Sequence, residues 1–392
     1  MSEQNVGWML RRFYVFKLLL SMQFFSAVLV PFFTVWGKIS LAEVQTLQSW
    51  FMLCIVLSEI PTGAFADRFG RKRSLLLGTV FMICGFIVYP LVPDFRVFMC
   101  GELMLALGQG FISGADTALL KGALKHVGRL DLFDVGIRRS RSFSMVGIML
   151  SGIVGGVIST YFGMQWTMFL SAIPALLGLV VLWPFQDVFA PKANYLDAIR
   201  NGLRHFKYNR TIQRATLNML LVSAGAYYVI WYYQPLLMRI NVSIAYFGFM
   251  HAGLSMIQIV ILMGFGVFVA LCGTRLKASM VASVLTGLGF VAAIIPHPIG
   301  IAVFIILSGG FGLTRSDTLA ADLTNHIPMD QQATVGSLIS MLRRLALVIL
   351  NPVMGLIATA SLDMALLIAG LLPLLSLLVP LNDEFFERRT DE

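Results

Sequence analysis

A short basic segment enclosed by two apolar segments constrains this chain most. It runs GAFADRFGRKR from Gly63 to Arg73, and an apolar stretch of roughly 20 residues, enough for a helix to span a bilayer, lies on each side of it. A tight basic turn between two such helices is typical of the cytoplasmic side of a multi-pass membrane protein, because cytoplasmic loops carry an excess of lysine and arginine. The segment therefore predicts a membrane fold and its orientation.

Composition agrees with a membrane protein. Of the 392 residues, 58% are hydrophobic and only 12% are charged, whereas soluble domains have about 25% charged residues. The formal net charge of +9 does not indicate nucleic-acid binding, because most basic residues, including Arg11, Arg12 and Lys17, fall in segments expected on the cytoplasmic side. The four cysteines show no metal-ligand spacing, and we interpret them as packing residues. We expect no metal ion and no other cofactor.

Twelve apolar segments are long enough to span a bilayer. They predict an all-α membrane protein with twelve transmembrane helices in two pseudo-symmetric six-helix bundles. The predicted spans are 13–36, 43–66, 74–92, 96–121, 137–161, 164–185, 212–238, 243–270, 278–296, 299–325, 331–360 and 362–381. We expect an N-terminal bundle over 1–185, a cytoplasmic linker over 186–211 and a C-terminal bundle over 212–392. Both termini should lie in the cytoplasm, at the inner or plasma membrane of the cell.

The two halves resemble each other at an offset of about 200 residues. Ala115-Asp116-Thr117 in the fourth predicted span corresponds to Ser316-Asp317-Thr318 in the tenth. The fifth and eleventh spans share a Gly-x-Ile-x-Thr pattern, which ends at Thr160 and at Thr359. Two six-helix halves around a site near the membrane midplane are the plan of many secondary transporters.

The basic segment resembles the loop 2–3 signature of the major facilitator superfamily, G-x-x-x-D-R-x-G-R-[RK]-[RK]. All signature positions match, namely Gly63, Asp67, Arg68, Gly70, Arg71, Lys72 and Arg73. The chain is thereby identified as a member of this family, similar in general to its bacterial efflux members. The resemblance implies that these residues form a conformational latch between the halves. The second half has Ala270 where the aspartate would be, so any latch is one-sided.

The fifth span is similar to the antiporter signature of the same family, G-x-x-x-G-P-x-x-G-G. It reads Gly147-x-x-x-Ser151-Gly152-x-x-Gly155-Gly156, with Ser-Gly in place of Gly-Pro. Small residues also permit close contact between any two membrane helices, so both interpretations stay open. The arginine that drug antiporters carry in the fourth span is absent, because Ala106 occupies its position.

Ionisable side chains inside a membrane span are costly to bury and mark functional sites. Burial favours the neutral form of a carboxylate, which lets it accept a proton near neutral pH. The candidates for proton coupling are Glu59, Glu102, Asp116 and Asp317. Glu102, Gln109, Ser113 and Asp116 are spaced to share one face of the fourth helix. The resemblance implies that this helix lines a central cavity; interhelical hydrogen bonds are the alternative role for the stripe.

Further polar and aromatic residues are candidates for a substrate cavity. They are Gln23, Gln109, Ser113, Tyr228, Trp231, His251, Gln258, Arg315, Arg343 and Arg344. Arginine favours a carboxylate, a phosphate or a zwitterion as ligand, although a structural ion pair with a nearby acid is the alternative for each arginine. We assign Tyr232 and Tyr233 to an aromatic belt at the membrane surface.

These features predict a secondary active transporter, not an enzyme. It would export a small anionic, zwitterionic or amphiphilic solute in exchange for protons by alternating access. The partners we expect are that solute, protons and the lipid bilayer, with no nucleic acid, and the resemblance implies a monomer. A proton-coupled importer is one alternative, and a transport-inactive membrane sensor or scaffold is the alternative from another class.

Overall fold

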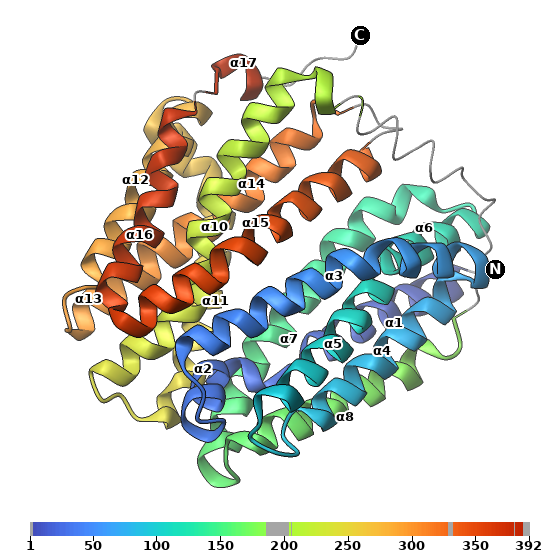
Figure 1. Cartoon of the computed structure of the whole chain (residues 1–392). Helices are drawn as coiled ribbons and strands as arrows, with labels where there is room; N and C mark the ends of the chain where they lie inside the picture. Colours follow the sequence, from blue (N-terminus) through green and yellow to red (C-terminus); the bar gives the residue numbers. More distant parts are fainter. Residues whose placement is uncertain (1–2, 186–203, 205, 328–331, 380, 387–392) are drawn as a thin grey trace. The chain divides into compact units, whose positions relative to one another are not determined.

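The computed structural model of the chain describes residues 3–185, 204, 206–327, 332–379 and 381–386. All regular secondary structure in these ranges is helical (Figure 1), which confirms the predicted all-α fold. Most of the predicted linker 186–211 lies outside the described residues.

The helices follow the predicted spans closely. In the first half they are α1 (Glu3–Ser21), η1 (Phe24–Val28), α2 (Leu29–Pro31), η2 (Phe32–Trp36), α3 (Leu41–Phe69), α4 (Arg71–Val88), α5 (Phe95–Ile112), α6 (Ala115–His126), η3 (Leu130–Leu132), α7 (Phe133–Tyr161) and α8 (Met164–Leu182). In the second half they are α10 (Arg210–Arg239), η4 (Ile244–Tyr246), α11 (Phe247–Cys272), α12 (Arg275–Ala292), α13 (Pro298–Phe304), η5 (Ile305–Gly312), α14 (Leu313–Thr324), α15 (Gln332–Ala360), α16 (Leu362–Leu375), η6 (Ser376–Leu378) and α17 (Asp383–Phe386).

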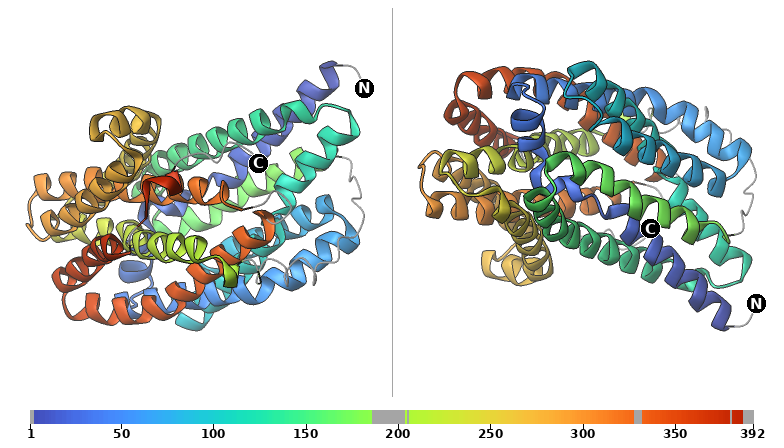
Figure 2. Two further views of the ribbon diagram at one scale, coloured as in Figure 1. Left: turned by 90° about the horizontal axis from the view of Figure 1, so that it is seen from above. Right: turned by 90° about the horizontal axis from the view of Figure 1, so that it is seen from below.

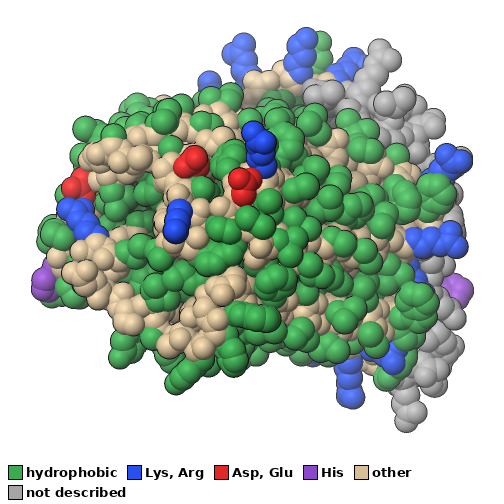
Figure 3. All heavy atoms as spheres, turned by 60° about the horizontal axis from the view of Figure 1, so that its bottom comes forward, with side chains coloured by type: hydrophobic (Ala, Val, Ile, Leu, Met, Phe, Trp, Pro, Cys, Tyr) green, Lys and Arg blue, Asp and Glu red, His purple; other side chains and the backbone are tan. Residues whose placement is uncertain are grey.

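Nine helical stretches among the described residues are long and apolar enough to cross a membrane. The remaining three predicted spans are occupied by α4, α10 and α16, so all twelve ranges contain helix. Twelve as the number of helices that cross the membrane stays a prediction. Hydrophobic side chains cover most of the face in Figure 3, as expected for a surface in contact with lipid.

The chain divides into two compact units. The first comprises Met1–Lys192 and Ser243–Ala252, and the second comprises Ala193–Val242 and Gly253–Glu392. Within the first unit α5 packs against α3 and α4, and α1 packs against α7 and α8 (Figures 1 and 2). Within the second unit α10 packs against α14 and α16, and α12 packs against α16 and η5.

The first, fourth and tenth predicted spans depart from a regular α-helix well inside their length. The first ends its α-helix at Ser21 and resumes as a 3-10 helix at Phe24, after an extended residue Gln23 with φ −110°. The fourth is interrupted at Gly114, whose φ of 74° suits a residue without Cβ. The tenth contains the π-helix η5. Interrupted helices place free backbone groups inside the membrane, and many transport proteins bind solutes and ions there.

Candidate functional site

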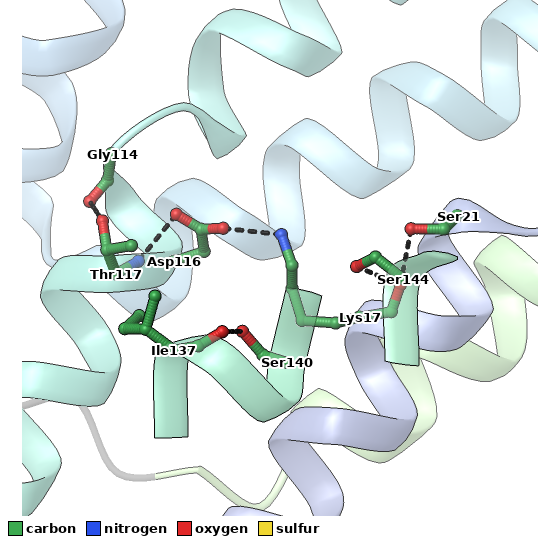
Figure 4. A network of polar contacts seen from close by, with 8 residues as sticks. All are labelled: Lys17, Ser21, Gly114, Asp116, Thr117, Ile137, Ser140 and Ser144. Carbon is green, nitrogen blue, oxygen red and sulfur yellow. Dashed lines mark hydrogen bonds and ion pairs between the residues drawn. The ribbon is translucent and has the colours of Figure 1, made fainter. Parts of the chain in front are cut away.

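An ion pair joins the two interrupted helices of the first unit. Lys17 Nζ lies 2.7 Å from Asp116 Oδ2, and the two side chains are 21% and 16% exposed. Lys17 lies four residues before the end of α1, and Asp116 lies in the first turn of α6 (Figure 4). The ion pair therefore links the residues just before the interruption at Gln23 to the residues just after the interruption at Gly114.

The backbone around the interruption fixes the Asp116 carboxylate. Its Oδ1 accepts a hydrogen bond from the Thr117 backbone N–H at 2.6 Å, and the Thr117 hydroxyl donates to the Gly114 carbonyl at 3.1 Å. A carboxylate in the first turn of a helix is also stabilised by the helix dipole. Both carboxylate oxygens thus have a partner while Asp116 is ionised, and protonation removes the charge that attracts Lys17.

The glycine-rich face of α7 packs against the interruption of the first helix. A Cβ atom on Gly147 would come within 2.5 Å of the Leu18 carbonyl oxygen. About two turns further along α7, a Cβ atom on Gly155 would overlap the Phe24 carbonyl oxygen. These glycines of the antiporter-like motif therefore allow α7 to approach the backbone on both sides of the interruption.

The other glycines of the motif face the first turns of α11, which belong to the same unit. A Cβ atom on Gly152 would lie 3.0 Å from the Gly248 carbonyl oxygen and 3.1 Å from a ring carbon of His251. A Cβ atom on Gly156 would lie 3.1 Å from the Cα atom of Gly248. The motif thus has two packing faces, and the predicted cavity residue His251 lies beside one of them.

Glu102 is buried apart from the ion pair. It is 4% exposed and accepts a hydrogen bond from Gln48 Nε2 at 2.7 Å, and the Tyr89 hydroxyl is its second partner. Gln109 and Ser113 are exposed, whereas Glu102 is not. The predicted continuous stripe on the fourth helix is therefore wrong, because the helix is interrupted at Gly114 and its polar residues have different surroundings.

Several of the other predicted residues are more accessible than Glu102. Glu59 on α3 and Gln23 at the first interruption are half-buried. Asp317 on α14 is exposed and accepts a hydrogen bond from Gln258 Nε2 at 3.5 Å. Arg343 on α15 lies within electrostatic range of Asp317, and the adjacent Arg344 is half-buried.

Arg315 is the buried arginine of the second unit, with 2% of its surface exposed. Its Nε donates to Ser279 Oγ at 3.0 Å and its Nη2 to Asn218 Oδ1 at 2.9 Å. Its Nη1 lies 3.5 Å from Ser376 Oγ. These partners are neutral, and they tie α14 to α12, α10 and η6. Sequence reasoning missed them, although Asn218 follows Lys17 by 201 residues, the repeat offset of Asp116 and Asp317.

Aromatic side chains of α10 pack against α15. The Tyr228 hydroxyl donates to Asn351 Oδ1 at 3.0 Å, and the Tyr232 hydroxyl donates to the Met354 carbonyl at 3.3 Å. Trp231 is 5% exposed, and Tyr232 and Tyr233 are fully buried. The assignment of these two tyrosines to an interfacial belt is therefore wrong, because belt residues project toward lipid and water.

The signature segment forms a tight turn between α3 and α4. Asp67 Oδ1 pairs with Arg71 Nη2 at 2.6 Å across Gly70, whose φ of 105° is in the region that favours glycine. Lys72 Nζ lies 5.7 Å from the ring of Trp183. Of the other signature positions, Gly63 is half-buried and Arg68 and Arg73 are exposed. Their role as a latch stays a prediction.

Lys17 is the most important residue that sequence reasoning missed. It lies close to the basic residues Arg11 and Arg12, yet it falls inside the predicted span 13–36. The criterion applied to the acids, a charge inside a span, would have selected it.

Comparison with known proteins places the chain among membrane transporters. A family model described as Major Facilitator Superfamily matches residues 15–351. A D-xylose transporter of Levilactobacillus brevis is 28% identical over 165 residues, which are 40% of this chain and 35% of the relative. A chloramphenicol efflux pump of Mycobacterium tuberculosis is 21% identical over 47% of this chain and 44% of the relative. These alignments span less than half of either relative.

A longer alignment and the solved structures extend the likeness. A probable 4-methylmuconolactone transporter of Cupriavidus pinatubonensis is 25% identical over 70% of this chain and 60% of the relative. The crystal structure of the nucleoside transporter NupG superposes with a TM-score of 0.78 at 12% identity, covering 94% of this chain and 98% of that one. At such identity the structures show a shared fold alone.

Proposed function

We propose that this chain, which belongs to the Major Facilitator Superfamily, is a secondary active transporter of the inner or plasma membrane. It works as a monomer with both termini in the cytoplasm and exports a small zwitterionic or amphiphilic solute in exchange for protons by alternating access. The family and the fold support transport. The relatives include an efflux pump and a galactose-proton symporter, so direction and coupling must be argued from the residues.

The observation that carries the proposal is the ion pair between Lys17 and Asp116. Charges inside apolar segments are rare and belong to functional sites by default. When Asp116 takes up a proton, Lys17 loses its counter-ion, and the contact between α1 and α6 weakens. Proton binding thereby favours a different arrangement of the two interrupted helices, which is what coupling to a conformational change requires.

The pair also relates the charge of the solute to the direction of transport. A solute that presents an ammonium group or hydroxyl groups to Asp116 competes with the proton, and competition for one site gives exchange. A purely anionic solute pairs with Lys17 instead and leaves Asp116 to take up a proton, so both move together. Proton-coupled import is therefore the second candidate function, and the Lys17–Asp116 geometry favours it for an anion.

The other predicted residues have supporting roles in this proposal. Glu102, with its neutral partners, is the second candidate for proton binding. Gln109 and Ser113 contact the solute in this proposal, and their exposure on the helix that ends before Gly114 supports that role. The turn that pairs Asp67 with Arg71 acts as the latch.

Everted membrane vesicles test the direction and the coupling. Chloramphenicol, D-xylose and 4-methylmuconolactone are suitable probes, because transporters of these solutes are among the relatives. When the lumen is acidic, vesicles that contain the wild type should accumulate a probe that the protein exports and lose from the lumen a probe that it imports. A protonophore should abolish both movements. Asp116→Asn should remove the effect of the gradient. Asp134→Asn, at an exposed carboxylate in the first turn of α7, is the matched control.

The outcomes separate the classes of function. A solute that enters the lumen only with the gradient identifies an exporter, and a solute that leaves with it identifies an importer. If neither these probes nor a wider metabolite panel shows gradient-dependent flux, the transport proposal fails and a membrane sensor or scaffold takes its place.

A further inference from the structure

Two buried N–H donors in the second unit have no hydrogen-bond partner among the described residues. They are Trp231 Nε1 on α10 and Asn351 Nδ2 on α15, and these residues are 5% and 0% exposed. A buried donor without an acceptor destabilises a fold, and native proteins contain few of them. In an apolar membrane environment no bulk water replaces the missing acceptor. Two such donors together indicate that an acceptor comes from outside the chain.

Contacts between side chains bring the two donors into one cluster. Asn351 Oδ1 accepts a hydrogen bond from the Tyr228 hydroxyl at 3.0 Å, and Asn351 Nδ2 is left without an acceptor among the described residues. The Tyr228 ring lies 5.4 Å from the Tyr227 ring, and the Tyr227 ring lies 6.2 Å from that of Trp231. The cluster therefore extends from Asn351 to Trp231 through two adjacent aromatic side chains.

The helices that carry the donors are held together independently of them. The Tyr232 hydroxyl donates to the Met354 carbonyl at 3.3 Å, one turn further along both helices. The Tyr228 and Tyr232 rings stack at 5.4 Å with an interplanar angle of 17°. The two free N–H groups are thus not required to join α10 to α15, and a structural role does not account for them.

We propose that Asn351 and Trp231 form a hydrogen-bonding subsite whose donors bind carbonyl, carboxylate or other acceptor oxygens of the transported solute. The proposal rests on the transport function and names the class of solute. The subsite offers two donors, and the acceptor of Asn351 is already occupied by Tyr228. It selects solutes that present an acceptor and rejects solutes without one, because rejected solutes leave both donors unpaired. The neighbouring rings add apolar contact.

Solute binding to the purified full-length protein tests the subsite. Chloramphenicol, D-xylose and 4-methylmuconolactone are probes that carry acceptor oxygens, and tetraethylammonium is a probe that carries none. Thermal stabilisation titrated against each probe gives its affinity. We expect the wild type to bind at least one acceptor-bearing probe and not tetraethylammonium.

Two variants remove the donors singly. Trp231→Phe keeps an aromatic ring and removes the N–H, and we expect affinity to fall about tenfold, the size of one hydrogen bond to a solute. Asn351→Asp keeps an acceptor for Tyr228 and replaces the donor by a second acceptor, with a larger loss. A buried carboxylate can impair folding. If Asn351→Asp does not fold, the result for Trp231→Phe alone tests the subsite. Trp166→Phe and Asn325→Asp, at exposed positions, are the matched controls and should bind as the wild type does.

The outcomes also separate this proposal from the transport proposal. Unchanged affinity in Trp231→Phe overturns the subsite, as does a wild type that binds tetraethylammonium in preference to every acceptor-bearing probe, or that binds no acceptor-bearing probe. If binding depends on Trp231 and Asn351 but vesicles show no flux of the bound probe, the subsite stands and the transport proposal fails.

Discussion

In the first unit an ion pair joins α1 to α6. In the second unit the corresponding helices, α10 and α14, meet through a buried arginine with neutral partners. Lys17 pairs with Asp116, and the positions 201 residues further on are Asn218 and Asp317. There the cation lies on the other helix, as Arg315, and Asn218 accepts its hydrogen bond at 2.9 Å. Protonation of a carboxylate can break the contact of the first unit but not that of the second.

A second pair of contacts also differs between the units, namely that of the first predicted span with α7 and that of α10 with α15. In the first unit glycines of α7 meet the backbone beside the interruption, and the hydroxyl oxygens of Ser26 and Ser151 lie 3.4 Å apart. In the second unit the Tyr228–Asn351 hydrogen bond joins α10 to α15 within an aromatic cluster. We therefore propose a division of roles, in which the first unit couples transport to protons and the second unit supplies the hydrogen-bonding subsite that selects the solute.

The largest expected effect on stability is that of Arg315→Gln. The change removes three hydrogen bonds from a charged donor and leaves Asn218 and Ser279 without it, so we expect the free energy of unfolding to fall by about 3 kcal/mol. Thermal unfolding in detergent measures the loss. Arg343→Gln, at an exposed position on α15, is the control and should change stability by no more than about 0.5 kcal/mol. If Arg315→Gln is as stable as the wild type but no longer binds solute, Arg315 contacts the solute and the comparison between the units breaks.

A smaller effect is expected where α7 approaches the first helix. Gly155→Ala places a Cβ atom against the Phe24 carbonyl oxygen, and relief of the overlap should cost about 2 kcal/mol. Gly253→Ala, where a Cβ atom would have no neighbour within 4 Å, should be neutral or slightly stabilising because alanine favours helix. Equal melting temperatures for the two variants would show that the backbones are not in close contact at Gly155.

The smallest effect on stability is expected at the signature turn. The Asp67 and Arg71 side chains are 35% and 27% exposed, so Asp67→Asn should lower the free energy of unfolding by about 0.5 kcal/mol or less. If the turn acts as a latch, the same variant should nevertheless transport several times more slowly than the wild type. A variant that loses several kcal/mol instead would assign Asp67 to the core of the fold.

The sequence was sufficient for the helical plan, because long apolar segments and a basic turn are local signals. It was not sufficient for the interruptions at Gln23 and Gly114, since hydropathy is the same whether a span is continuous or broken. The hydrogen-bond partners of Arg315 could not be predicted from the sequence either. Its partners Ser279, Ser376 and Asn218 lie 36, 61 and 97 residues away along the chain, and only packing brings them together.

The sequence selects Asp116 as a candidate for proton coupling, but it does not indicate its partner Lys17. Lys17 follows closely on Arg11 and Arg12, and a cation near a basic terminus is ambiguous between topology and function. Asn351 could not be recognised as a candidate from the sequence, because a polar amide in an apolar span reveals its orientation only when its partner Tyr228 is known.

The division of roles between the units is tested most directly in proteoliposomes that contain wild type, Asp116→Asn or Trp231→Phe. Two quantities are measured for a bound probe, namely accumulation driven by a pH gradient and exchange of labelled for unlabelled solute without a gradient. We predict that Asp116→Asn keeps exchange and loses gradient-driven accumulation, while Trp231→Phe weakens the apparent affinity for solute in both assays and keeps the ratio of protons to solute. Loss of exchange in Asp116→Asn with intact coupling, or loss of coupling in Trp231→Phe with unchanged affinity, would contradict the account.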